Sequence, residues 1–421
     1  MSFLAATGKR SGWEVTAMPD AIDFQEGPGI LAKDFRDSGV PLVRLSGLAR
    51  GASVLEGCNY LDAGMVDRRW SHFRLKAGDI LLSTSATLGR VAVVTRAAEG
   101  AIAYTGIIRM RPRGPSLSAA YIPYLLESQE FLDQAEGMGA GSVIRHFGPT
   151  HLKRMKVTIP PRAVQERIVG ILSAYDELIQ NSLRRIKILE AMARAIYREW
   201  FVEFRFPGHE RLARAASPLG EIPKGWEVKT VANCFVISGG GTPSRKEPEY
   251  WEGGSIQWFS PSDLTGAGTM FMDDSRDHIT EQGLAQSSAR MFPARCVMLT
   301  SRATIGAIAI NTHPACTNQG FITCIPNERM PLYYLYCWVA ENVPNFQRLA
   351  AGATFKEISR GVFRTIEVIQ PTDSIVRRFE ELVTPIGEQV LTLQRQVGSL
   401  RRTRDLLLPR LLSGQVELEA A

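Results

Sequence analysis

The chain has 421 residues, with 49 Lys and Arg against 43 Asp and Glu, which gives a formal net charge of +6. This length predicts two or three domains at roughly 100–200 residues each, and a hydrophobic content of 45% excludes a wholly disordered chain. No apolar run approaches the roughly 20 residues of a membrane span and no export signal opens the chain, so we expect a cytoplasmic protein without a membrane partner.

The first 160 residues have the pattern of an α+β domain. Short β-like runs are separated by Gly, Pro, Asp and Ser, and they predict strands at Ile80–Thr84, Arg90–Thr95 and Ile107–Arg111. Tyr121–Ser128 has the pattern of a helix, and a further strand-like run begins at Met155 and ends at a pair of prolines. We therefore predict a first globular domain over residues 1–160.

A long helix is predicted next, in a spacer region over residues 161–215. Its apolar residues recur at steps near four and three, which is the seam of a coiled coil rather than the wider stripe of a helix on a large core. Ser182 fills the one gap in this series. The seam consists of Ile168, Leu172, Tyr175, Ile179, Ile186, Leu189, Ala193, Ile196 and Trp200.

The second half of the chain predicts the same elements again. A second globular domain is expected over residues 216–371, with a helix at Leu332–Ala340 and strands at Val297–Ser301, Ala307–Asn311 and Phe321–Ile325. A second helical spacer region follows over residues 372–421, where Pro385 and Pro409 should kink or end the helix. Its seam consists of Phe379, Val383, Ile386, Val390, Leu393, Val397, Leu400, Leu407 and Leu411, with Arg404 at one seam position.

Five ordered matches identify an internal duplication. Ile80 to Gly89 matches Val297 to Gly306 at a shift of 217 residues. The other matches are Gly12-Trp13-Glu14-Val15 with Gly225-Trp226-Glu227-Val228, Thr105-Gly106-Ile107-Ile108 with Gln319-Gly320-Phe321-Ile322, Gly141-Ser142-Val143-Ile144-Arg145 with Gly352-Ala353-Thr354-Phe355-Lys356, and the two proline-closed strands. The expected fold class is thus α+β, with two globular α/β domains separated by two long antiparallel coiled-coil helices and related by a pseudo-two-fold axis.

Two matching seams in one chain can pack against each other, which we favour over an external coiled-coil partner. A helix of roughly 35 residues is about 50 Å long, so the pair would form a spacer between two related domains. Duplex DNA with two half-sites suits such a protein, because dimeric DNA-binding proteins use the same geometry.

Hydroxyls, cations and glycine amides at the matched turns are the candidate contacts to phosphates and bases. For the turn 85–90 and its counterpart 302–306, the alternative is a plain strand–turn–strand corner. For the glycine-rich segment 238–246 the alternative is a flexible surface loop. Two pairs of cations occupy matching positions in the two copies, Arg145 with Lys356 and Lys153 with Arg364, and for them the alternative is a solvated face. The candidate DNA-binding residues are Thr87, Arg90, Arg145, Lys153, Gly240, Thr242, Ser244, Arg245, Lys246, Arg302, Thr304, Gln319, Lys356 and Arg364. Tyr104 and Trp258 could also contact bases, although Trp258 fits a core position better.

The patterns of catalytic sites are absent from the sequence. It contains no H-E-x-x-H, no G-x-S-x-G and neither motif of an adenine methyltransferase, and its six histidines lack metal-ligand spacing. The six cysteines form no C-x-x-C pair and predict buried thiols in a reducing compartment. We expect no catalytic residues and no metal site.

The ordered set of motifs resembles the DNA-specificity (S) subunits of type I restriction–modification systems. The resemblance covers essentially the whole chain and is carried by four segments: Gly220-Glu221-Ile222-Pro223-Lys224-Gly225-Trp226-Glu227-Val228; Arg302-Ala303-Thr304-Ile305-Gly306 with Asn318-Gln319-Gly320; Glu199-Trp200-Phe201-Val202 with Phe204-Arg205-Phe206-Pro207-Gly208; and Arg404-Asp405-Leu406-Leu407-Leu408-Pro409-Arg410-Leu411.

This resemblance implies that each globular domain is a target-recognition domain for one half of a bipartite double-stranded DNA sequence. It also implies that the helices set the spacer and dock two modification (methyltransferase) subunits, with restriction subunits joining afterwards. S-adenosylmethionine, ATP and Mg would then bind those partners and not this chain. The alternatives are a single-chain methyltransferase or nuclease with an unrecognised active site, and a protein scaffold that does not bind DNA.

Overall fold

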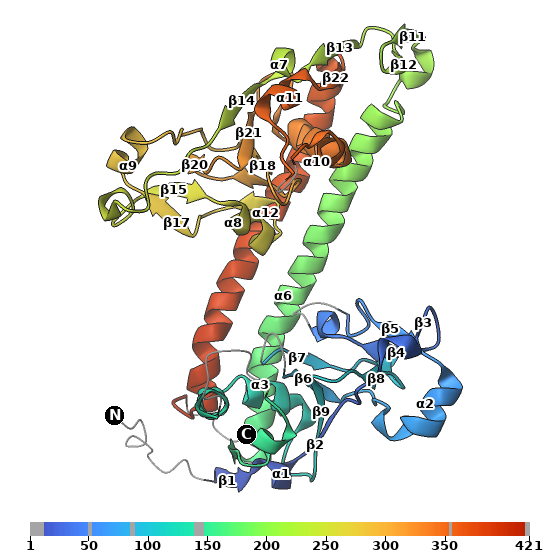
Figure 1. Ribbon diagram of the computed structural model, residues 1–421, viewed down its shortest axis with the longest axis vertical. Coiled ribbons are helices and arrows are strands. Elements are labelled where there is room, and N and C mark those ends of the chain that lie inside the picture. Colours follow the sequence, from blue (N-terminus) through green and yellow to red (C-terminus); the bar gives the residue numbers. More distant parts are fainter. Residues whose placement is uncertain (1–11, 49–52, 85–88, 139–146, 353–355, 417–421) are drawn as a thin grey trace. The chain divides into compact units, whose positions relative to one another are not determined.

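The computed structural model describes residues 12–48, 53–84, 89–138, 147–352 and 356–416, which divide into two compact units (Figure 1). Unit 1 comprises residues 1–180 and 399–421, and unit 2 comprises residues 181–398. Among the described residues, no helix is both long and apolar enough to cross a membrane.

Unit 1 contains two four-stranded sheets and a two-stranded pair. The first sheet has the order β2-β9-β6-β7 and the second β3-β5-β4-β8, while β1 pairs with β10. The strands are β1 (Glu14–Ala17), β2 (Ile22–Glu26), β3 (Phe35–Arg36), β4 (Val40–Val43), β5 (Asn59–Leu61), β6 (Ile80–Ser83), β7 (Val91–Val93), β8 (Ile102–Ala103), β9 (Ile107–Pro112) and β10 (Lys156–Ile159).

The helices of unit 1 pack on the first sheet, except for the one that contains Val66, which packs against the second sheet. They are α1 (Met18–Ala21), α2 (Ala63–Arg69), α3 (Ile122–Leu126), α4 (Gln129–Gly137), α5 (Pro149–Leu152) and the first part of α6 (Arg162–Tyr197). The main core of the unit joins the first sheet to the long helices, because Ile80 and Met110 belong to the same buried cluster as Leu172 of α6 and Leu411 at the end of α12 (Asp373–Leu412).

Unit 2 repeats this plan with five strands in its first sheet, three in its second and one further two-stranded pair. Its sheets have the orders β14-β21-β18-β19-β16 and β17-β15-β20. The pair of β13 with β22 corresponds to the pair of β1 with β10, and β11 with β12 form the further pair. The strands are β11 (Arg214–Ser217), β12 (Gly220–Pro223), β13 (Glu227–Thr230), β14 (Val236–Gly239), β15 (Ile256–Phe259), β16 (Phe271–Met272), β17 (Asp277–Ile279), β18 (Val297–Thr300), β19 (Ile308–Asn311), β20 (Ala315–Thr317), β21 (Phe321–Ile325) and β22 (Glu367–Gln370).

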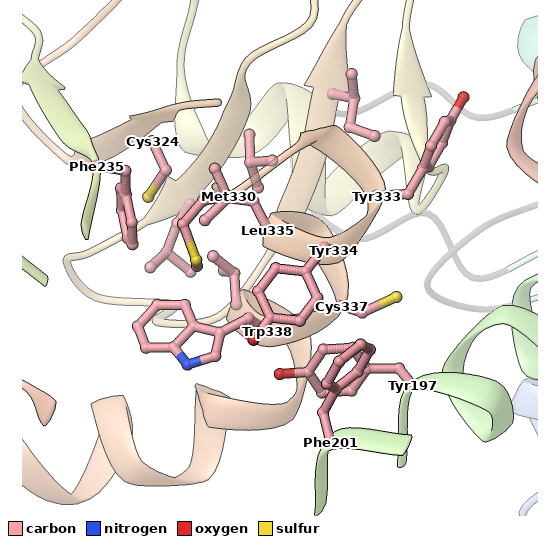
Figure 2. Packing of buried hydrophobic residues seen from close by; sticks show 14 of the residues in the cluster. Tyr197, Phe201, Phe235, Cys324, Met330, Tyr333, Tyr334, Leu335, Cys337 and Trp338 are labelled. Carbon is pink, nitrogen blue, oxygen red and sulfur yellow. The ribbon is translucent and has the colours of Figure 1, made fainter. Parts of the chain in front are cut away.

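An aromatic core holds unit 2 together. Figure 2 shows Tyr197, the last residue of α6, and Phe201, in the π-helical turn that follows, beside Tyr334. The ring centroids of Phe201 and Tyr334 are 4.7 Å apart. Phe379 of α12 lies 5.1 Å from Phe201 in an edge-on arrangement, so the two long helices and the globular domain share one core. The other helices are α7 (Val231–Cys234), α8 (Pro261–Ala267), α9 (Glu281–Ala285), α10 (Leu332–Leu349) and α11 (Arg360–Thr365).

The duplication extends to individual backbone hydrogen bonds. The amide of Thr84 donates to Gly106 O at 2.9 Å, and Ser301 donates to Gly320 O at 2.8 Å at the matching positions of unit 2. Parallel pairs also recur, since β4 pairs with β8 as β15 pairs with β20. The predicted α+β fold class with an internal duplication is confirmed.

In each predicted seam six of the nine apolar residues are buried and the other three are half-buried. Within unit 1 the two long helices run in opposite directions. Leu411 shares a core with Ile168, whereas Arg404, seven residues earlier in α12, binds Asp176, eight residues later in α6. Ser182 at the gap of the first seam is also buried, at 5% exposure.

Pro385 and Pro409 were expected to kink or end the second helix, and they do not end it, since α12 runs unbroken from Asp373 to Leu412. Both prolines lie at exposed positions, where water can reach the carbonyls that lose their amide partners. The helix predicted at Leu332–Ala340 likewise continues to Leu349, past the exposed Pro344. The helix predicted at Tyr121–Ser128 ends at Leu126, because Ser128 instead caps α4 by accepting a hydrogen bond from Phe131 N at 3.2 Å.

Candidate nucleic-acid interface

Four loops of unit 2 meet at one edge of its sheets. We call residues 239–246, 300–306, 317–320 and 356–360 the loop face of unit 2. Main-chain hydrogen bonds join them in sequence: Gly241 N donates to Thr317 O at 2.9 Å, Ser301 N to Gly320 O at 2.8 Å and Ile358 N to Ser301 O at 3.0 Å. Segments more than 100 residues apart in the chain are therefore held as one surface.

The turn 300–306 has a rigid frame and an exposed tip. The buried Thr300 hydroxyl donates to Thr304 O at 2.6 Å and accepts from Ala307 N at 2.9 Å. Ala303 has a φ of 60° and Gly306 a φ of 107°, and the Ala303 amide donates to Lys356 O at 3.1 Å. Arg302 and Thr304 are exposed on this turn, and the Arg302 guanidinium lies 3.8 Å from the Glu357 carboxylate.

Two predicted residues contact each other directly at the centre of the loop face. The Thr242 hydroxyl donates to Oε1 of Gln319 at 2.7 Å, across 77 residues of sequence, and both residues are exposed. Gly240 lies beneath them, where a Cβ atom would stand 2.1 Å from the carbonyl oxygens of Thr317 and Asn318. The glycine thus lets two backbone segments approach closely, a structural role that the sequence pattern did not distinguish from phosphate binding.

The segment 242–246 is not a free loop. The Arg245 guanidinium lies 3.5 Å from the ring centre of Trp251 and donates to Asp277 at 2.5 Å. The indole of Trp251 in turn donates to Ser244 O at 3.0 Å. Trp258 is 3% exposed and belongs to the core, as its sequence position favoured. Lys246 is exposed at the end of this segment.

Unit 1 builds the same frame from different side chains. Residues 26–28, 83–84, 89–90 and 103–106 are the described part of its loop face. Gly27 takes the place of Gly240, since a Cβ there would stand 2.1 Å from Ala103 O. Arg90 follows the turn, donating its amide to the Ser83 hydroxyl at 2.9 Å, and its side chain is exposed. Thr87 and Arg145 lie outside the described residues.

Two predicted cations lie away from the loop faces. Arg364 lines a shallow cavity of about 370 Å³ with Val236 and Asn327, at the end of β14 opposite Gly239. Lys153 follows α5 and precedes Met155, whose carbonyl accepts the amide of Met18 before β2 begins. At about 3.3 Å per residue, the length of β14 places the cavity that Arg364 lines about 10 Å from Gly239. Arg364 also lies one turn of α11 beyond Arg360, the last residue of the loop face of unit 2.

Sequence reasoning missed two arginines that the structure brings to the loop faces. Arg44 stacks on Tyr104 of unit 1, with its guanidinium 4.3 Å from the ring centre. Arg360 crosses Gly239 of unit 2, where an added Cβ would meet its Nη1 at 2.1 Å. The glycine run 239–241 could have indicated that another group, here Arg360, packs closely against this backbone. No local pattern in the sequence indicated Arg44.

Within the described residues, no group of His, Cys, Asp and Glu is placed to hold a metal ion. The cysteines are free thiols, and all except the half-buried Cys58 are buried. Burial raises the pKa of the Cys296 and Cys316 thiols to about 12, which keeps them protonated near neutral pH. The loop faces instead present hydroxyls, amides and guanidinium groups, which are donors suited to an anionic, acceptor-rich polymer.

Comparison with known proteins places this architecture in a family. The family model described as "Type I restriction modification DNA specificity domain" matches residues 10–191 and again residues 223–385. The two matches correspond to the two copies of the duplication and together cover most of the chain.

Similar proteins carry a consistent description. The MjaIX type I restriction enzyme specificity subunit of Methanocaldococcus jannaschii is 25% identical over 348 residues, which are 81% of this chain and 78% of the relative. A putative MjaX specificity subunit of the same organism is 21% identical and covers 97% of this chain and 94% of its own length. The Escherichia coli EcoR124I/EcoR124II specificity subunit is 30% identical over 192 residues, 45% of this chain and 42% of its own length.

The fold is also that of a solved structure. The crystal structure of a type I restriction–modification S subunit from M. genitalium superposes with a TM-score of 0.59 at 15% identity and covers 96% of both chains. The chain belongs to the family of type I restriction–modification DNA specificity subunits.

Proposed function

We propose that the globular domain of each unit binds one half of a bipartite double-stranded DNA sequence through its loop face. The main support for this proposal is that the two units, built from separate parts of the chain, contain the same hydrogen-bonded loop frame. Thr84 to Gly106 in unit 1 and Ser301 to Gly320 in unit 2 fix equivalent turns, yet the exposed side chains on them differ. Such a pair of surfaces suits two half-sites of different sequence.

The shared frame and the divergent side chains have different tasks in this proposal. Backbone amides, hydroxyls and scattered cations at the frame contact phosphates and set the register of each domain on the duplex. Side chains that only one unit carries contact base edges, because only they can distinguish one half-site from the other. The modest net charge of +6 suits a DNA-binding subunit that shares its phosphate contacts with partner subunits.

The long helices, in the same proposal, dock two methyltransferase subunits, and restriction subunits join that assembly in the cytoplasm. S-adenosylmethionine, ATP and Mg bind those partners, and this chain contributes no catalytic residue. Leu178 and Ile188 of α6 support docking, since both are about half exposed on a helix whose seam is already filled.

A domain exchange tests the two-domain model. The complex of this chain with the methyltransferase subunit of its own system is expressed in a host without adenine methylation, and methylated sites are mapped by single-molecule sequencing. Replacing residues 225–371 by the equivalent segment of another family member should change one half of the methylated sequence and leave the other half unchanged. A change in both halves, or in neither, contradicts the model.

Salt dependence separates DNA binding from a purely scaffolding role. Neutralising several phosphates releases counterions, so the affinity of the complex for its duplex should fall by orders of magnitude between 50 and 200 mM salt. An affinity that does not depend on salt would instead favour a protein scaffold.

A further inference from the structure

Each unit holds one arginine over an aromatic ring beside its loop face. In unit 2, the Arg245 guanidinium lies 3.5 Å from the ring centre of Trp251. In unit 1, the Arg44 guanidinium lies 4.3 Å from the ring centre of Tyr104 and 5.6 Å from that of Phe35. The stack fixes the plane of each guanidinium and leaves its N–H groups at the edges of that plane.

A side chain at the same position of both units orients these arginines. Asp277 is the first residue of β17 and pairs with Trp258 of β15. Asn59 is the first residue of β5 and pairs with Leu42 of β4, which is the matching place in the duplicated sheet. Asp277 accepts from Arg245 Nη2 at 2.5 Å, and Asn59 Oδ1 accepts from Arg44 Nη1 at 3.2 Å.

The arginines themselves come from different places in the chain. Arg44 directly follows β4, at the position that Ser260 occupies after β15, whereas Arg245 lies in the segment after β14. A residue kept only for packing would be expected at one position in both copies. Here both units have an oriented guanidinium, but the arginine that carries it stands at a different position in each copy of the duplication.

Both guanidinium groups keep donors available. A guanidinium has five N–H donors in a fixed fork, and the interactions described for Arg245 use one of them. The Arg245 side chain remains 53% exposed despite its stack and ion pair. Asn59 carries no charge, so Arg44 keeps its positive charge uncompensated by that contact.

We propose that Arg245 and Arg44 each read one guanine, by donating two hydrogen bonds to its O6 and N7 in the major groove, with Asp277 and Asn59 as positioning residues. This inference rests on the proposed function. Guanine is the base that offers two adjacent acceptors in the major groove, and a planar fork held by a stack matches that pair. A phosphate can also accept two parallel hydrogen bonds from an arginine, but such a contact carries no sequence information, so the effect on the methylated sequence separates the two kinds of contact.

The test uses the complete complex and the same methylation mapping. In Arg245→Met the apolar stem stays on Trp251 and the donor fork is lost. We expect one G·C position in one half-site to become degenerate, with its preference reduced by about 5- to 150-fold, while the other half-site is unchanged. Arg44→Met should have the same effect at one G·C position of the other half-site.

Matched controls and a conservative variant complete the experiment. Arg290→Ala in unit 2 and Arg96→Ala in unit 1 remove exposed arginines outside the loop faces and should leave the motif intact. Arg245→Lys keeps the charge and should restore the guanine preference only in part, because an ammonium cannot present the fixed fork.

Three outcomes would overturn the inference. The first is an unchanged motif in both methionine variants. The second is a uniform loss of methylation with no position becoming degenerate, which would identify phosphate contacts. The third is full rescue by Arg245→Lys. Failure of the proposed function looks different, since the wild-type complex would then produce no bipartite motif or the domain exchange would not alter one half alone.

Discussion

The phenol of Tyr333 donates a hydrogen bond of 2.8 Å to Oε1 of Glu388, and this contact ties the globular domain of unit 2 to α12. The same carboxylate accepts from Arg295 Nη1 at 2.8 Å. The hydrogen bonds from Arg295 hold the pKa of Glu388 below its ordinary value, so the group is charged at neutral pH. The globular domain is therefore joined to α12 through the Glu388 carboxylate, which accepts hydrogen bonds from a neutral phenol and from a guanidinium cation.

Unit 1 uses the same chemistry with one difference. Tyr124 donates to Asp176 of α6 at 3.1 Å, and Asp176 accepts from Arg404 at 2.6 Å. The arginine here comes from the second long helix, whereas in unit 2 it comes from the globular domain. Both copies thus contain the tyrosine–carboxylate contact, whereas the arginine that binds the carboxylate comes from a different element in each copy.

The close packing of Tyr333 predicts an unusual response at Gly387. A Cβ at Gly387 would stand 2.0 Å from Cε1 of Tyr333, whereas a Cβ at Gly398 in the same helix would meet nothing within 4 Å. We expect Gly387→Ala to destabilise the protein by about 1–3 kcal/mol through overpacking. Gly398→Ala should instead stabilise it by up to about 1 kcal/mol, because alanine favours the helix.

Urea unfolding of the two variants measures both effects, with the circular dichroism of the helices as the signal. Equal shifts of the midpoint in the same direction would contradict the close contact between Tyr333 and the backbone of α12.

The buried Arg404 predicts strong coupling with Asp176. Arg404 is 3% exposed and occupies a seam position that the heptad pattern assigns to an apolar residue. Arg404→Met should cost about 1–3 kcal/mol, a reduced form of the cost of breaking a buried ion pair, because Asp176 remains 35% exposed. The double variant Arg404→Met, Asp176→Met should recover part of that loss, since Asp176 no longer lacks its partner and Asp405, the other carboxylate that Arg404 contacts, is 61% exposed and remains hydrated.

Thermal unfolding of wild type, both single variants and the double variant gives the coupling free energy. Additive losses would mean that the two side chains do not act as a pair.

The Asp273–Arg395 ion pair predicts a dependence of stability on acid. Hydrogen bonds from Arg395 hold the pKa of Asp273 below its ordinary value, and the closest N–O distance is 2.8 Å. A carboxyl whose folded pKa is depressed contributes stability above its unfolded pKa of about 4, and this contribution is lost as the pH falls through the folded pKa. Asp273→Asn should therefore lower the melting temperature at pH 7 and have progressively less effect below pH 4.

Differential scanning calorimetry across this pH range checks the sign, with Glu252→Gln as the control at an exposed carboxylate. A difference between wild type and Asp273→Asn that grows as the pH falls would refute the assignment.

The duplication, the strands and both seams could be predicted because each is a local pattern. Val297–Thr300 and Phe321–Ile325 are runs of apolar residues that fill a buried sheet, and the seams repeat at heptad spacing. Helix ends were less predictable. Pro344 and Pro385 both lie inside helices, because solvent exposure, which the sequence does not record, decides whether the freed carbonyls can be hydrated.

The loop faces could be predicted only as turns with polar side chains. Which polar groups meet depends on how the sheets bring distant segments together, as with Thr242 and Gln319. The orienting role of Asp277 for Arg245 had no local signal either. Lys153 and Arg364 hold matching places in the two copies, each three residues before the strand β10 or β22, and neither belongs to the segments that form the loop faces.

The close approach at Gly240 gives a direct test of the loop face as the DNA-binding surface. A Cβ at this position would stand 2.1 Å from Thr317 O and Asn318 O, whereas one at Gly266 of α8 would meet nothing within 4 Å. Gly240→Ala must push the 239–246 segment away from the 317–320 segment and break the contact between Thr242 and Gln319. We expect the complex to lose at least tenfold in affinity for its cognate duplex, while Gly266→Ala binds as the wild type does.

Fluorescence anisotropy with a labelled duplex measures the affinity, and circular dichroism verifies that the helices remain folded. Because the unit 1 frame is untouched, Gly240→Ala should retain its preference for the half-site that unit 1 reads, when duplexes altered in one half are compared. Wild-type affinity in this variant would show that the geometry of the 239–246 and 317–320 loops does not matter for DNA binding, and the DNA-binding surface of unit 2 would then have to lie elsewhere than on the loop face.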